Sequence, residues 1–139
     1  MPIYKIDDVA KELGLTKRTI RYYEEIGLLF PPERTSGGVR LYTPEHVEVL
    51  RRIVDARDVL GFSLQEISDY VSIAKKLDEH RAMYRSTEDS ALKLQQLREV
   101  HEITGKQLEM IDQKFAKMLK LRKEIEQLHQ RVSEIIEPQ

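Results

Sequence analysis

The stretch from residue 86 to residue 136 contains no proline and a single glycine, Gly105. Apolar residues recur through it at steps of three and four, which is the spacing of a coiled-coil seam. A helix of roughly 50 residues is about 75 Å long at 1.5 Å per residue. Such a helix cannot bury its apolar stripe against a small domain, so the stripe predicts a partner, most simply a second copy of the chain. The expected dimerisation residues are Leu97, Thr104, Leu108, Ile111, Phe115, Met118, Leu121, Ile125, Leu128 and Val132.

The seven-residue rhythm slips twice along this helix. Two steps of four flank Thr104 and two steps of three flank Met118, so a local change of winding is expected at both places. Ser86 is the expected N-cap of the helix. We expect a connector over residues 76–88 and the dimerisation helix over residues 89–137.

Residues 1–75 differ from this long helix in composition, because glycine and proline divide them into short elements. Asp7 is the expected N-cap of a first helix that ends at Gly14. Thr16 is the expected N-cap of a second helix that ends near Ile26, before Gly27. Two short helices joined by so short a turn are typical of a helix-turn-helix domain.

A small wing is expected after the second helix. Pro31 and Pro32 exclude helix there, and the sequence "VRLY" alternates as a short strand does. We expect Leu28–Phe30 to pair with this strand, with "RTSGG" as the tip of the hairpin.

Two further helices complete the expected domain. Thr43 caps the first of them, with Pro44 at its first position, and a capping box of Ser63 and Glu66 opens the second. The predicted fold is therefore mainly α: a winged helix-turn-helix domain with a small two-stranded wing, followed by a long C-terminal helix.

Composition excludes several functional classes. The net charge is −1, and residues 1–75 hold 11 Lys and Arg against 12 Asp and Glu, so any attraction to nucleic acid must come from local placement. Cysteine is absent, which excludes disulfides and thiolate metal sites. No leader sequence or long apolar run is recognisable, so we expect a cytoplasmic protein with no membrane contact. No catalytic constellation stands out, so we expect no enzyme activity, no cofactor and no metal site.

The second helix carries a cationic face that a core helix would not need. On a helical wheel Ile20, Tyr23 and Gly27 share the inward side, whereas Arg18 and Arg21 lie on the other side with Lys17 and Tyr22 near them. Cations at the start of such a helix suit phosphate and guanine contacts in a major groove. Arg34 and Arg40 flank the expected wing tip, where they could reach the minor groove or the backbone. A third cluster, formed by Arg51, Arg52 and Arg57, is as readily explained by neutralisation on the helix surface.

The strings "RTIRYYEEIGLL", "RTSGGVRLYT" and "LGFSLQEI", in this order, closely resemble the MerR family of bacterial transcription regulators. The resemblance covers roughly the first 75 residues and implies two winged helix-turn-helix domains held by an antiparallel coiled coil. It implies a palindromic operator in double-stranded promoter DNA, between two promoter elements whose spacer is too long. Effector-bound protein would bend and untwist this DNA to bring the elements into phase for RNA polymerase.

The resemblance also implies roles for single residues. Arg18, Arg21 and Tyr22 would contact DNA from the recognition helix, and Arg40 and Tyr42 from the wing. For Tyr23 two interpretations stay open, since the helical wheel sends it to the core while the family pattern leaves room for a contact through its hydroxyl. The sequence departs from many relatives at Val39 and Asp58, where they carry aromatic or basic residues. The full candidate DNA-binding set is Thr16, Lys17, Arg18, Thr19, Arg21, Tyr22, Tyr23, Arg34, Arg40 and Tyr42.

The effector is left open. Without cysteine, sensing of mercury, copper or zinc through thiolates and an iron–sulfur switch are excluded. An antiparallel dimer centred near Phe115 would bring His101 of one chain level with His129 of the other, and a metal or proton switch at this pair is one alternative for sensing. Met83 and Tyr84 either pack the joint before the long helix or line an effector pocket. The alternative to a promoter-binding homodimer is a coiled-coil adaptor or architectural protein, whose small domain binds protein, or DNA without promoter control.

Overall fold

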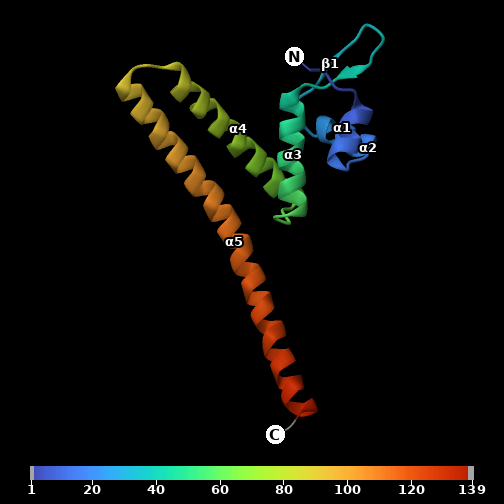
Figure 1. The fold of residues 1–139 in the computed structure, drawn as a ribbon, viewed down its shortest axis with the longest axis vertical. Coiled ribbons are helices and arrows are strands. Elements are labelled where there is room, and N and C mark those ends of the chain that lie inside the picture. Colours follow the sequence, from blue (N-terminus) through green and yellow to red (C-terminus); the bar gives the residue numbers. More distant parts are fainter. Residues whose placement is uncertain (1, 138–139) are drawn as a thin grey trace. The chain divides into compact units, whose positions relative to one another are not determined.

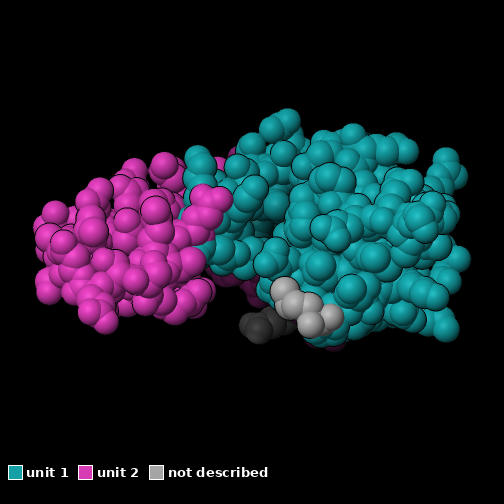
Figure 2. Space-filling view, turned by 90° about the horizontal axis from the view of Figure 1, so that it is seen from above, with its two compact units in different colours: residues 1–78 teal, residues 79–139 magenta. Residues whose placement is uncertain are grey.

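The computed structural model describes residues 2–137, so the first residue of the expected DNA-binding domain lies outside the described residues. The chain divides into two compact units, residues 1–78 and residues 79–139 (Figure 2). Within residues 2–137 the fold is mainly α with one two-stranded sheet, as predicted. The elements, labelled in Figure 1, are α1 (Ile6–Leu13), α2 (Lys17–Glu25), β1 (Glu33–Arg34), β2 (Arg40–Leu41), α3 (Pro44–Asp58), α4 (Leu64–Ser86) and α5 (Ser90–Ile136).

The expected helix-turn-helix is present as α1 and α2. The Thr16 hydroxyl accepts the backbone N–H of Thr19 at 3.0 Å, which confirms the predicted N-cap of α2. Gly14 ends α1 in the left-handed conformation, with φ 66°. The predicted Asp7 cap is wrong, because α1 begins at Ile6 and the Asp8 carboxylate accepts the backbone N–H of Lys5 at 3.3 Å. Both acids therefore lie in the first turn, where the helix dipole favours negative charge.

The Thr16 cap predicts a measurable contribution to stability. Thr16→Ala is expected to lower the free energy of unfolding by about 1 kcal/mol, because one of the first N–H groups of α2 loses its acceptor. Urea unfolding followed by circular dichroism measures this loss. Ser72→Ala, at an exposed position within α4, is the control and is expected to cost nothing. Equal losses in both variants would contradict the capping role.

The wing is a two-stranded antiparallel sheet with Glu33 opposite Leu41 and Arg34 opposite Arg40. The predicted pairing of Leu28–Phe30 is wrong. The backbone N–H groups of Leu28 and Leu29 instead donate to the carbonyl of Tyr23, at 2.9 and 3.1 Å. Gly27, with φ 80°, turns the chain back so that these groups close the end of α2.

A backbone bridge joins the N-terminal segment to Tyr42, the residue that directly follows β2 of the wing. Tyr4 and Tyr42 exchange two N–H···O hydrogen bonds of 2.8 Å each, in antiparallel arrangement. The wing is thereby tied to the body of the first unit on the side of β2. Sequence patterning did not indicate this contact.

The remaining start signals of the first unit behave as predicted. Thr43 caps α3 with Pro44 at its first position. In the capping box that opens α4, the Ser63 N–H donates to Glu66 Oε1 at 3.0 Å and the Glu66 N–H donates to Ser63 Oγ at 3.3 Å. The wholly buried large side chains of this unit are Tyr42, Ile20, Leu29, Leu50, Ile53 and Val9.

Most of the segment expected as a connector is helical. α4 continues to Ser86, and only residues 87–89 separate it from α5. The predicted Ser86 cap is wrong, since Asp89 caps α5 by accepting the Ala91 N–H at 2.9 Å. Residues 76–86 contain no glycine or proline, so nothing local stops the helix.

α5 is one continuous helix of 47 residues (Figure 1). Most of its predicted seam is solvent-exposed in the single chain: Phe115 is 66% and Ile125 60% exposed, whereas Thr104 and Ile111 are half-buried. Apolar side chains are normally scattered on a monomer surface, so a row of them along one helix marks an interaction surface. No helix within residues 2–137 is both long and apolar enough to cross a bilayer.

Candidate nucleic-acid interface

The outward face of α2 carries free cations. Arg18 and Arg21 are exposed, and neither makes an ion pair with another described residue. Ile20 and Tyr23, on the opposite face, are buried in the first unit and fix the rotation of the helix. Two guanidinium groups with all their N–H donors available are therefore presented side by side to solvent, which is a surface suited to phosphates and base edges.

The start of α2 is partly neutralised. The Lys17 ammonium forms an ion pair with Asp7 and holds the pKa of that carboxyl below its usual range. Both groups are exposed, so the pair contributes little to stability and can open when a phosphate competes. The hydroxyls of Thr16 and Thr19 lie 2.8 Å apart and complete the cap.

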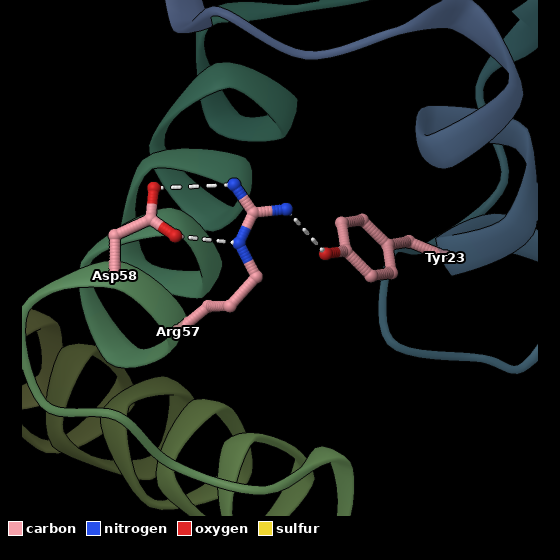
Figure 3. Close-up of polar contacts among 3 residues, drawn as sticks. All are labelled: Tyr23, Arg57 and Asp58. Carbon is pink, nitrogen blue, oxygen red and sulfur yellow. Dashed lines mark hydrogen bonds and ion pairs between the residues drawn. The ribbon is translucent and has the colours of Figure 1, made fainter.

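The two adjacent tyrosines have different surroundings. Tyr22 is 43% exposed, whereas Tyr23 is only 5% exposed, as the helical wheel predicted. Arg57 of α3 reaches across to Tyr23, and its Nη1 donates to the phenol oxygen at 3.4 Å (Figure 3). A DNA contact through the Tyr23 hydroxyl stays a prediction, since its observed neighbour is this guanidinium.

Asp58 explains why Arg57 is a weak candidate for DNA. Nε and Nη2 of Arg57 donate to the two Asp58 carboxylate oxygens at 2.7 and 3.1 Å (Figure 3). This fork lowers the pKa of Asp58 and raises that of Arg57. Asp58 thus neutralises its neighbour Arg57.

The rest of the third cluster is paired as well. Arg51 Nη2 lies 3.5 Å from Glu12 Oε1. Arg52 holds Asp78 with two hydrogen bonds of 2.7 and 3.2 Å, and this carboxylate raises the Arg52 pKa. The third cluster therefore adds little net positive charge, whereas Arg18 and Arg21 of α2 and Arg34 of the wing stay free of ion pairs among the described residues.

The wing presents one free and one tethered arginine. Arg34 is exposed and has no ion-pair partner among residues 2–137. Arg40 Nε donates to Glu24 Oε1 of α2 at 3.1 Å, and its side chain is 24% exposed. The wing tip between them carries exposed Val39.

Tyr42 lies in the core. Its side chain is wholly buried, and its hydroxyl donates to Glu24 Oε2 at 2.6 Å. Burial, followed by this carboxylate, raises the Tyr42 pKa well above its ordinary value, so the phenol keeps its proton. A direct DNA contact from Tyr42 stays a prediction, and its observed contacts are structural.

Sequence reasoning missed Glu24, which links α2 to the wing. A signal was available, because Glu24 is the fourth residue after buried Ile20 and so lies near the inward side of the helix. A carboxylate near the inward side of a helix needs hydrogen-bond donors, and Arg40 and Tyr42 supply them here.

His46 lies beneath the wing. Its side chain is buried, stacks on Phe30 with ring centroids 3.8 Å apart, and accepts the Thr43 N–H at Nδ1 over 3.0 Å. Nε2 is buried and makes no hydrogen bond to any residue within 2–137. Burial lowers the His46 pKa, opposed in part by the backbone of Pro31 and Phe30 and by the nearby charges of Glu24 and Glu45.

The lowered pKa of His46 gives stability a pH dependence. The neutral ring is favoured in the folded state, so its contribution is fully present above about pH 6.5, the ordinary histidine value, and is lost as pH falls through the folded pKa. Protonation of Nδ1 would also place its new N–H opposite the backbone N–H of Thr43, so that two donors would face each other. We expect urea unfolding at several pH values to show stability falling below about pH 6.5. The fall should be reduced in His46→Gln but not in the exposed control His101→Gln. Identical pH profiles for all three proteins would contradict this.

The second unit contains the residues considered for sensing. Tyr84 is covered by the Lys93 ammonium at 5.1 Å from the ring centroid, and His80 Nδ1 lies 2.7 Å from Gln96 Oε1. These contacts tie the last turns of α4 to the first turns of α5, which fits the packing interpretation of this joint. Met83 is 54% exposed.

Comparison with known proteins connects this geometry to one family. The family model described as MerR HTH family regulatory protein matches residues 4–73. The HTH-type transcriptional regulator YfmP of Bacillus subtilis (strain 168) is 45% identical over 111 residues, which are 80% of this chain and 79% of that protein. The HTH-type transcriptional regulator CueR of Salmonella typhi is 44% identical over 77 residues, 55% of each chain.

The fold is also found in a solved structure. HiNmlR, described as a MerR family regulator lacking the sensor domain and bound to promoter DNA, aligns with 88% of this chain and 80% of its own. The TM-score is 0.52 at 18% sequence identity, so the likeness concerns the fold alone.

Proposed function

This chain belongs to the MerR family and is a DNA-binding transcription regulator, and from that premise we propose that it acts as a homodimer on an inverted-repeat operator. Each subunit places α2 in a major groove, with Arg18, Arg21 and Tyr22 on the base edges and phosphates. Arg34 and Arg40 contact the flanking backbone from the wing. Two-fold symmetry of the dimer then requires two inverted half-sites.

The observation that supports this proposal is the distribution of free cations. Arg18, Arg21 and Arg34 lack acid partners among residues 2–137, whereas the third cluster is paired. Because the third cluster is neutralised, the arginines of the first unit that remain available to phosphates are those of the recognition helix and the wing, despite a net charge of −1.

The exposed stripe of α5 supports the homodimer. We propose an antiparallel coiled coil centred near Phe115, which would set Leu97 against Val132 and Ile111 against Met118. The same register would bring His101 level with His129 of the second chain. A parallel dimer, or a centre displaced by one heptad, would refute this register.

The proposed action is deformation of the operator. The dimer bends and untwists an overlong promoter spacer so that RNA polymerase can engage both promoter elements, in the cytoplasm and by binding alone, without a catalytic step. YfmP and CueR are named as transcriptional regulators, which supports promoter control. The proposal includes no cofactor and leaves the effector unassigned.

The function is tested by selecting bound fragments from a random or genomic DNA pool. Binding to the most enriched sequence is then measured at increasing salt concentration. We expect one inverted repeat, with an affinity that falls steeply with salt as counterions are released. A specific site without inverted symmetry would contradict the dimeric mode of binding.

The adaptor alternative rests on the same long helix together with the near-neutral charge. It predicts a stable dimer that enriches no sequence and binds DNA weakly at moderate salt. The selection experiment therefore separates the two functions, provided the dimer is verified by analytical ultracentrifugation in the same buffer.

A further inference from the structure

One carboxylate joins the recognition helix to the wing. Glu24 lies in α2 with its side chain only 10% exposed. Its Oε1 accepts Arg40 Nε at 3.1 Å, and its Oε2 accepts the Tyr42 hydroxyl at 2.6 Å. Both donors belong to the wing segment, Arg40 in β2 and Tyr42 next to it. The contact therefore fixes one DNA-facing element against the other.

Arg40 is held by one edge. The guanidinium is planar and carries five N–H donors in a rigid fork, of which Glu24 engages the one on Nε. Because the guanidinium is rigid and planar, a hydrogen bond at Nε also fixes the orientation of Nη1 and Nη2. The N–H groups on Nη1 and Nη2 are left to bind a phosphate with two parallel hydrogen bonds.

Glu24 is itself fixed from the core. Tyr42 is wholly buried, exchanges two backbone hydrogen bonds with Tyr4, and contacts His46 edge-to-face with ring centroids 5.5 Å apart. The Tyr42 hydroxyl therefore holds Oε2 of Glu24 in place. A continuous set of contacts runs from the core through Tyr42 and Glu24 to Arg40.

We propose that Glu24 is a positioning residue for DNA binding: it directs the terminal nitrogens of Arg40 toward the DNA backbone. This inference rests on the proposed wing contact. Two effects of the carboxylate oppose each other, because its charge offsets that of Arg40 while its hydrogen bond removes rotamer freedom that binding would otherwise have to remove. The partly buried, two-donor arrangement favours the second effect, since the Glu24 charge is already engaged by Tyr42.

A double-mutant cycle on the selected operator tests the proposal. Arg40→Ala is expected to weaken binding about tenfold, as loss of one charged hydrogen-bonding group does, and to lower the salt slope by about 1. Glu24→Ala is expected to give most of the same loss and the same change of slope. In the Arg40→Ala background Glu24→Ala should have no further effect.

Two conservative variants separate positioning from packing. Glu24→Gln keeps an oxygen acceptor at the same reach and is expected to recover most of the affinity lost in Glu24→Ala. Tyr42→Phe removes only the hydroxyl that holds Glu24, and should give a smaller loss that also disappears without Arg40. Thermal unfolding of each variant verifies that the domain is folded.

Three outcomes would overturn the inference. Tighter binding by Glu24→Ala would make Glu24 a neutralising group. An equal loss with and without Arg40 would make its role purely structural. An Arg40→Ala variant with unchanged affinity and slope would show that Arg40 makes no contact with DNA, which would leave Glu24 nothing to position. Continued recognition of the inverted repeat by that variant would leave the regulator function intact.

Discussion

A chain carrying both Phe115→Asp and Ile125→Asp is expected to be monomeric and to bind the operator about a hundredfold or more weakly. The two side chains are 66% and 60% exposed in the single chain and lie on the apolar stripe of α5. In the proposed coiled coil they become buried, where an unpaired carboxylate is strongly unfavourable. Each half-site then binds alone, because the second recognition helix no longer benefits from being linked to the first.

Sedimentation measures the loss of the dimer, and operator titration measures the loss of affinity. Gln113→Asp, at an exposed position on the opposite side of α5, also introduces a carboxylate and is expected to change neither the oligomeric state nor the affinity. Circular dichroism and the unfolding of residues 1–78 within the full chain verify that the DNA-binding unit stays folded. A double variant that remains dimeric would refute the seam, and a monomer with full operator affinity would refute the need for a dimer.

Arg18→Ala is expected to weaken operator binding by about 1–3 kcal/mol and to relax the sequence preference at one position of each half-site. The reason is that Arg18 is exposed on α2 with no ion pair among the described residues, so its donors are available to a base edge. Repeating the selection with the variant identifies the position that Arg18 reads.

The matched comparisons distinguish base reading from general attraction. Arg34→Ala in the wing should weaken all sequences alike and lower the salt slope by about 1. Arg85→Ala, an exposed arginine of the second unit, should change neither affinity nor preference. Unchanged operator affinity in Arg18→Ala would show that the recognition face is assigned wrongly.

The features that sequence predicted well are local ones. The Thr16 cap, the Thr43–Pro44 start and the Ser63–Glu66 box involve partners within three residues, so side-chain chemistry alone specifies them. Helical periodicity likewise indicated which face of α2 is buried and which face carries Arg18 and Arg21.

The errors concern contacts between distant segments and the ends of elements. Leu28–Phe30 has strand-like composition, but the reversal at Gly27 returns its N–H groups to Tyr23, and β1 forms later in the chain. Helix propensity carries α4 to Ser86, through most of the segment given as a connector. Helical spacing could have placed Glu24 near the inward side of α2, but local spacing does not specify its partners, which are 16 and 18 residues away.

The paired cations of the first unit bear on how such a regulator finds its site. Lys17, Arg51, Arg52 and Arg57 all have acid partners. Affinity for random DNA grows with the number of phosphates neutralised, so pairing these four cations with acids shortens the time that the unit spends on each non-operator sequence. A small pool of molecules can then survey a chromosome quickly, because little of it is sequestered at the vast excess of competing sites.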